Sequence, residues 1–294
     1  MSETQKFNIK QLPKLLVAAF KSWFGSEPFQ RSAIVAYYAV LSLPALVIII
    51  LKVVGSVWGE DIVRGELLSE ISQTIGPDAA DAIRTMIVNQ SGKNNSVFAA
   101  IIGIGTLLYG STGVFFQLQS ALDSIWEQEP SYKNDVVATL MSRVKSFGFI
   151  LILGFLLLTS FVLTSLLSTF SKQLDRILPE NLFDYLFVFD FLISVGFIYI
   201  LFATMFKYLP SAKISWKSVR TGAALTTFMF LIGKYLLAWY FNTMEPGSTY
   251  GAAGSIILIM LWVSYTSLIL LYGAHFTKQY ADKYVKGDYI TGGE

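Results

Sequence analysis

Residues 254–276 read GSIILIMLWVSYTSLILLYGAHF, a stretch without a single aspartate, glutamate, lysine or arginine. An α-helix rises about 1.5 Å per residue, so roughly 20 apolar residues cross the roughly 30 Å hydrocarbon core of a bilayer. The stretch therefore predicts a transmembrane helix. The whole chain is 54% hydrophobic and 14% charged, whereas soluble domains carry about 25% charged residues. We expect an integral membrane protein.

Five further runs are long and apolar enough to cross a bilayer. They are residues 33–51, 97–116, 147–167, 182–206 and 219–240. Backbone polar groups in lipid must be bonded within the segment, and these runs do not alternate as the strands of a transmembrane barrel do. We expect an all-α fold with about six transmembrane helices in one domain over residues 33–276, accompanied by amphipathic interfacial helices.

Lysine and arginine lie mainly on one side of the expected helices. Of the 22, fifteen fall in segment 1–32, in the second and fourth loops between the expected helices and in the tail 277–294. Six fall in the first and third loops, and Lys234 lies inside an apolar run. The positive-inside rule therefore predicts that both termini are cytoplasmic. No cleavage signal follows the first apolar run, which is expected to be retained as a membrane helix.

Two segments outside the six runs show the apolar period of a helix. In segment 1–32, Lys10, Lys14 and Lys21 alternate with apolar residues, which predicts a basic helix in the membrane interface that either positions the bundle or binds anionic lipid. Residues 58–96 predict an outer cap of two helices. The first ends at Gly76, and Pro77 and Asp78 open the second. The cap covers the bundle or rests on lipid headgroups.

Asp190 and Lys234 are charged positions inside apolar runs. A charge in hydrocarbon costs at least a few kcal/mol, so it normally faces protein or water and has a partner. By helical rise the two residues lie about 12 Å and about 9 Å below the same outer boundary. A short loop joins their runs, which predicts antiparallel neighbours. We hypothesise that they pair, either as a structural clamp or as a substrate or proton site.

Lys52 and Tyr250 complete the candidate binding residues. Lys52 lies closer to the outer boundary, where snorkelling also explains a lysine. Tyr250 lies in the polar, glycine-rich segment 242–255 before the last run. Irregular backbone at this depth occurs beside protein or water, so the segment either shapes a binding cavity or forms a tight turn.

Recognisable catalytic motifs are missing. The single histidine, His275, has no carboxylate or cysteine at metal-ligand spacing, and the chain contains no cysteine. Walker A, G-x-G-x-x-G and G-x-S-x-G patterns do not occur. We expect no enzyme activity, no metal and no cofactor.

Several blocks resemble the YihY/BrkB family of bacterial inner-membrane proteins, some of which have been labelled ribonuclease BN. The blocks are AIVAYYAVLSLP at 33–44, ALDSIW at 121–126, FKYLP at 206–210, YGAAG at 250–254 with Leu261 and Trp262, and YGA at 272–274. The matching positions are Tyr37, Ser42, Pro44, Trp126, Lys207, Pro210, Gly251, Trp262 and Gly273. One departure is His275, which replaces a residue that is usually acidic in the family.

The resemblance implies an all-helical protein of the bacterial cytoplasmic membrane with a role in envelope function, serum resistance or lipid transport. The ribonuclease label lacks support, because a tRNA nuclease needs a hydrolytic site and a basic groove for phosphates. We expect membrane lipids and no nucleic acid as partners. The favoured function is binding or translocation of a lipid or other amphiphile through a cavity among the helices. The alternative is a non-transporting scaffold for envelope assembly.

Overall fold

The computed structural model describes residues 9–91, 112–127, 183–244, 246 and 253–285. Every element in these residues is helical, which agrees with the expected all-α fold. The elements are η1 (Ile9–Gln11), α1 (Leu12–Phe24), α2 (Pro28–Trp58), α3 (Glu60–Thr74), α4 (Pro77–Ser91), a helix over residues 112–125, α7 (Phe183–Tyr208), α8 (Trp216–Met244) and α10 (Gly254–Tyr284).

Three described helices are long and apolar enough to cross a membrane. The spans are Phe191–Tyr208 in α7, Trp216–Phe241 in α8 and Gly254–Tyr284, the whole of α10. They confirm three of the expected runs as candidate membrane spans. The run 33–51 lies within α2, which begins earlier than expected, at Pro28. The run 147–167 and most of the run 97–116 lie outside the described residues.

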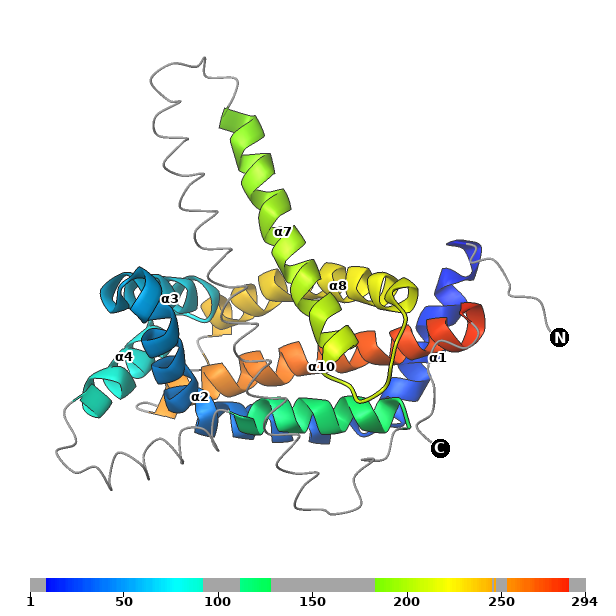
Figure 1. Cartoon of the computed structure of the whole chain (residues 1–294), viewed down its shortest axis with the longest axis horizontal. Helices are drawn as coiled ribbons and strands as arrows, with labels where there is room; N and C mark the ends of the chain where they lie inside the picture. The colour runs from blue at the N-terminus through cyan, green and yellow to red at the C-terminus, as the bar shows by residue number, and fades with distance from the viewer. Residues whose placement is uncertain (1–8, 92–111, 128–182, 245, 247–252, 286–294) are drawn as a thin grey trace.

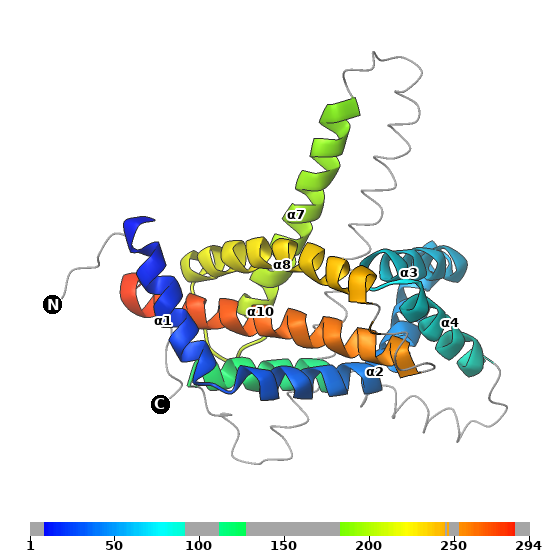
Figure 2. The same ribbon diagram turned by 180° about the vertical axis from the view of Figure 1, so that it is seen from behind.

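The helix α10 occupies the middle of the described structure, with contacts to α1, α2, α4 and α8. In Figures 1 and 2 the first part of α2, helix 112–125, α8 and α10 run side by side. The C-terminal part of α7 packs into this bundle through Phe202 and Phe206, whereas its N-terminal part extends away from the bundle in both views.

The seam between α8 and α10 is made by two glycines and two threonines. Thr226 Oγ1 donates to the Gly222 carbonyl at 2.8 Å, and Thr277 Oγ1 donates to the Gly273 carbonyl at 2.7 Å. Each threonine also packs on the glycine of the other helix, where an added Cβ would overlap the hydroxyl. Small residues allow such close approach in membrane bundles. The pairing of 222 with 277 and of 226 with 273 makes the two helices antiparallel.

The helices α3 and α4 pack at the N-terminal end of α10. Their boundaries agree with the expected cap: α3 ends just before Gly76, whose φ of 121° suits glycine, and α4 starts at Pro77. The cluster that joins them to α2 and α10 contains Val47, Leu51, Val63, Ala79, Ile83, Ile87 and Ile259. Ile62 of α3 is exposed and takes no part in this cluster.

The helix α1 packs at the opposite end of α10, across its last turns (Figure 2). The shared core consists of Leu15, Ala19, Tyr272, Phe276, Tyr280 and Tyr284. The sequence places Phe20 and Phe24 in the same apolar pattern as Leu15, yet both phenylalanines are exposed. The bundle therefore covers only one side of α1.

Candidate functional site

The motif block 121–126 meets the block 206–210 at one end of the bundle. The Asp123 carboxylate accepts from the Ser211 backbone N–H at 2.6 Å and from the Ser211 hydroxyl at 2.9 Å. Trp126 is buried in the same core as Leu209. At this end the Asp123 carboxylate of one block therefore bonds Ser211, the exposed residue that directly follows the other block.

Lys207 and Pro210 shape that turn. The Lys207 ammonium donates to the Ile214 carbonyl and lies 5.8 Å from the centre of the Trp216 ring. Pro210 is buried. A lysine that bonds a carbonyl and lies over an aromatic ring is fixed in place, so these two motif positions stabilise the connection between α7 and α8.

His275 connects α10 to α1. Its Nδ1 lies 3.0 Å from Ser22 Oγ, and its Nε2 lies 3.0 Å from Ser26 Oγ. A neutral imidazole donates through one ring nitrogen and accepts through the other, so both hydroxyls are satisfied without a charge. His275 therefore acts as a latch that holds α1 against α10.

An ion pair lies next to this latch. Lys278 Nζ is 2.5 Å from Glu127 Oε1, and the Glu127 side chain is largely exposed. The hydrogen bond and the positive charge of Lys278 hold the pKa of the Glu127 carboxyl below its usual range. The pair joins α10 to the end of helix 112–125.

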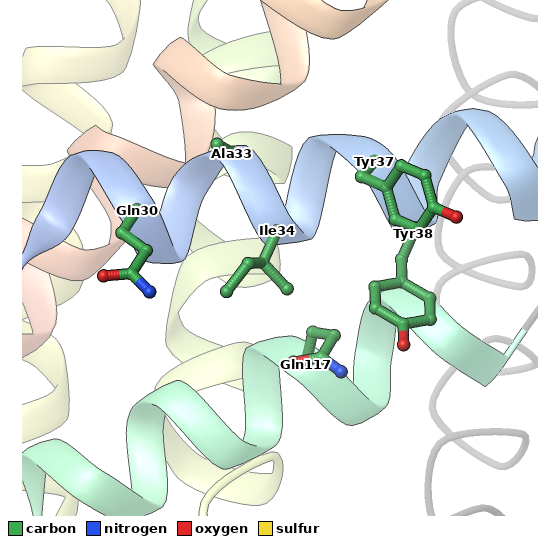
Figure 3. A pocket seen from close by; sticks show the side chains of 6 residues that line it. All are labelled: Gln30, Ala33, Ile34, Tyr37, Tyr38 and Gln117. Atoms are coloured by element: carbon green, nitrogen blue, oxygen red, sulfur yellow. The ribbon is translucent and has the colours of Figure 1, made fainter.

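A groove of about 580 Å³ separates part of α2 from helix 112–125 (Figure 3). The residues that line it are Gln30, Ala33, Ile34, Tyr37, Tyr38 and Gln117. In Figure 3 the side chains of Gln30, Ile34 and Tyr38 point from α2 towards helix 112–125, which carries Gln117. The lining combines apolar surface, two phenol rings and two amides. We call this site the α2 groove.

Two contacts join α2 to helix 112–125 near the α2 groove. Arg31 Nη2 donates to Ser124 Oγ at 3.0 Å, while Arg31 Nε donates to the Ser26 carbonyl at 2.8 Å. Farther along α2, Tyr38 lies against Gly113, where an added Cβ would be 2.9 Å from Tyr38 Cδ1. The seven-residue separation of Arg31 and Tyr38 corresponds to about 10 Å of helical rise. Most of the lining residues of α2 therefore fall between these two contacts.

The guanidinium of Arg31 is oriented by two fixed partners. Arginine has five N–H donors, and the bonds to Ser26 and Ser124 use two of them. Arg31 directly follows Gln30, which lines the α2 groove. A guanidinium held in this way suits a phosphate or carboxylate. Arg31 is not itself a lining residue, so an anionic group would reach it from the Gln30 end of the groove.

Of the candidate binding residues from the sequence, only Lys234 has its side chain within the described residues. It is a half-buried residue of α8, and it forms no ion pair with the other described side chains. Asp190 lies in α7 and Lys52 in α2, but their side chains are outside the described residues, as is all of Tyr250. The Asp190–Lys234 pair stays a prediction.

The remaining motif positions are mostly packing residues. Ser42 is buried and donates to the Ala39 carbonyl at 3.2 Å, and the half-buried Trp262 meets Phe230 edge to face at 6.2 Å between ring centres. Gly273 forms the α8–α10 seam. Pro44 lies within the helical backbone of α2, and Gly251 is outside the described residues. Tyr37 is the one that lines the α2 groove.

Sequence reasoning missed most of the groove. Gln30, Arg31, Tyr38, Gln117 and Ser124 were not among the expected site residues. One signal was available, because Gln117 directly follows the apolar run 97–116 and Gln30 and Arg31 precede the run 33–51. That signal alone does not say that the two segments face each other.

Comparison with known proteins identifies the family. The model of the family described as Virulence factor BrkB matches residues 19–289. A UPF0761 membrane protein of Histophilus somni (strain 2336) is 22% identical over 94% of this chain and 92% of its own length. One of Haemophilus influenzae (strain 86-028NP) is 25% identical over 83% of this chain and 87% of its own. No solved structure matches. The chain belongs to the Virulence factor BrkB family of membrane proteins.

Proposed function

We propose that this protein binds a phospholipid or similar amphiphile from within the membrane, through the α2 groove. The observation that carries the proposal is the mixed lining of an open groove beside a helix that contains an apolar run. Lipids lie beside a helix that crosses a bilayer. The ligand is therefore expected to be a component of the bilayer.

The chemistry of the groove suits the two parts of an amphiphile. Ile34, Ala33 and the face of Tyr37, a residue with 54% of its surface exposed, offer apolar area to an acyl chain. Amides and phenol hydroxyls offer hydrogen bonds near a headgroup. Arg31, at the end of the groove, adds a fixed positive charge that favours a phosphate.

Binding without chemical conversion is part of the proposal. The α2 groove contains amides and two phenols, and its lining has no acid–base pair of the kind that hydrolysis uses. Among the described residues, no group of three histidine, cysteine, aspartate or glutamate side chains is arranged to hold a metal ion. A binding and transport role accounts for the groove without further groups.

We further propose that the bound amphiphile moves between the leaflets along the α2 groove. Tyr38 packs on Gly113 at the end of the groove away from Arg31. An amphiphile that moves between leaflets along this route has to pass that contact. A scaffold needs no such passage. A measurement of lipid movement between leaflets therefore distinguishes the transport function from the scaffold alternative.

Photo-crosslinking of a diazirine phospholipid to the protein in nanodiscs tests binding. Ile34→Trp fills the groove, whereas Leu41→Trp places the same ring two turns farther along the exposed face of α2, outside the groove lining. We expect Ile34→Trp to lose most of the crosslink and Leu41→Trp to keep it. Equal labelling of both variants and the wild type, with melting temperatures unchanged, would sink the proposal.

A further inference from the structure

The helix α1 has an exposed face that is both apolar and basic. Val17, Phe20 and Phe24 are 55%, 50% and 61% exposed. Lys14 and Lys21 are exposed beside them, and α1 contains no acidic residue. We call these five residues the outer face of α1. An exposed apolar face of this kind marks an interaction site.

The arrangement on the helical wheel separates the two kinds of residue. At 100° per residue, the three apolar side chains fall within a sector of about 60°, and the two lysines fall in the next sector. The residues that pack on α10, which include Leu15 and Ala19, lie on the opposite side. The outer face is thus a distinct surface, separate from the α2 groove.

The depth of α1 follows from the length of α10. Thirty-one residues extend about 46 Å, whereas the hydrocarbon core is about 30 Å thick. About ten residues of α10 therefore extend beyond the core. The helix α1 packs on Tyr272, Phe276, Tyr280 and Tyr284, which form the end of α10. If the span starts at Gly254, α1 lies at the level of the lipid headgroups.

Several contacts fix the direction of the outer face. The Tyr272 hydroxyl donates to the Leu16 carbonyl at 3.2 Å, and the Trp23 ring meets the Tyr272 ring at 5.9 Å. His275 bonds Ser22 and Ser26. Because these bonds lie on the inner side of α1, the fold itself turns the phenylalanines outward.

We infer that the outer face of α1 docks on anionic lipids of the leaflet at its end of the bundle. The phenylalanines enter the apolar boundary of that leaflet, and the lysines contact anionic headgroups. Phe29, exposed in the first turn of α2, continues the apolar surface towards the membrane-spanning bundle. This continuity and the charge favour a lipid surface as the occupant.

The cysteine-free chain allows a direct test with the full-length protein. Single cysteines replace Val17 or Phe24, and a control cysteine replaces Lys213, an exposed residue of the loop between α7 and α8. Each carries a polarity-sensitive fluorophore. The proteins are placed in nanodiscs of equal parts phosphatidylcholine and phosphatidylglycerol, with a nitroxide quencher on one lipid or the other. Unchanged melting temperatures show that each variant is folded.

We expect the quenchers to reduce emission severalfold at positions 17 and 24 and hardly at 213. Labelled phosphatidylglycerol should quench more than labelled phosphatidylcholine. Replacing Lys14 and Lys21 with glutamine should remove that difference and keep the quenching. Water-exposed probes at 17 and 24 would overturn the docking and leave the face to a protein partner. Equal quenching by both lipids in the protein with its lysines intact would overturn the preference for anionic lipid.

Discussion

The α8–α10 seam and the α2 groove are two helix interfaces of one bundle with opposite construction. The seam places each threonine on a glycine of the other helix, so no space is left for a Cβ. At the α2 groove, the two helices meet at Arg31–Ser124 and at Tyr38–Gly113, and an open groove of about 580 Å³ lies beside these contacts. The contrast indicates that the seam stabilises the bundle, whereas the groove is available to a ligand.

Filling the seam should have the largest effect. Gly273→Ala places a methyl group against Thr226 Oγ1, and we expect about 1–3 kcal/mol of destabilisation from overpacking. Thermal unfolding of the purified protein measures it. Gly196→Ala in α7 is the matched control, because an added Cβ there meets no heavy atom of the described residues within 4 Å.

A second variant shows whether the seam itself is responsible. Gly273→Ala combined with Thr226→Ala removes the hydroxyl that the new methyl overlaps, so part of the lost stability should return. Additive losses in the double variant would contradict the proposed contact.

The His275 latch should have the next largest effect. His275→Leu removes the partner of two serine hydroxyls at a buried position, and each lost hydrogen bond is expected to cost about 0.5–1.5 kcal/mol. His275→Glu keeps an acceptor for both hydroxyls near Arg31 and Lys278, so it should lose less. Proteolysis within α1, measured against the wild type, reports release of this helix. If both variants were protected from proteolysis as well as the wild type is, the His275 latch would be dispensable.

Opening the end of the groove should change function more than stability. Tyr38→Ala removes the ring that lies on Gly113. We expect faster movement of a fluorescent phospholipid between leaflets of proteoliposomes, because the barrier at that end is smaller. Dithionite quenching measures the rate, and Leu41→Ala is the control on the same helix. A rate that stays at the level of protein-free liposomes in both wild type and Tyr38→Ala would favour the scaffold alternative.

The Lys278–Glu127 pair should have the smallest effect. Glu127 is largely exposed, and such pairs contribute about 0.5 kcal/mol or less. Lys278 lowers the pKa of Glu127, so the contribution is present above the usual pKa of the carboxyl and is lost as pH falls through the lowered value. Melting curves of Glu127→Gln and wild type should differ slightly at neutral pH and converge in acid. A constant difference at all pH values would contradict this.

The sequence predicted the features that depend on neighbouring residues. The length of an apolar run can be read directly from the sequence, and it located the helices α7, α8 and α10. Gly76 and Pro77 marked the boundary between α3 and α4 because each has a local backbone preference. Of the six expected spans, these three are candidate membrane spans in the part of the chain that the structure describes.

The features that depend on packing between distant segments were missed. The α2 groove needs residues near 30–38 to face Gln117, which periodicity cannot show. The sequence pattern did not separate the buried from the exposed apolar residues of α1, because an apolar stripe does not reveal which part of a helix the bundle covers. The Asp190–Lys234 pair also depends on packing between segments, and it stays a prediction because the Asp190 side chain lies outside the described residues.

The most direct test is a structure of the protein in nanodiscs at a resolution that shows bound lipid. The account predicts elongated density in the α2 groove beside Ile34 and Tyr37, with a headgroup phosphate within hydrogen-bonding distance of Arg31. A groove that is filled by protein side chains, with lipid density only on the exposed face of α8 around Phe228 and Ile232, would contradict it.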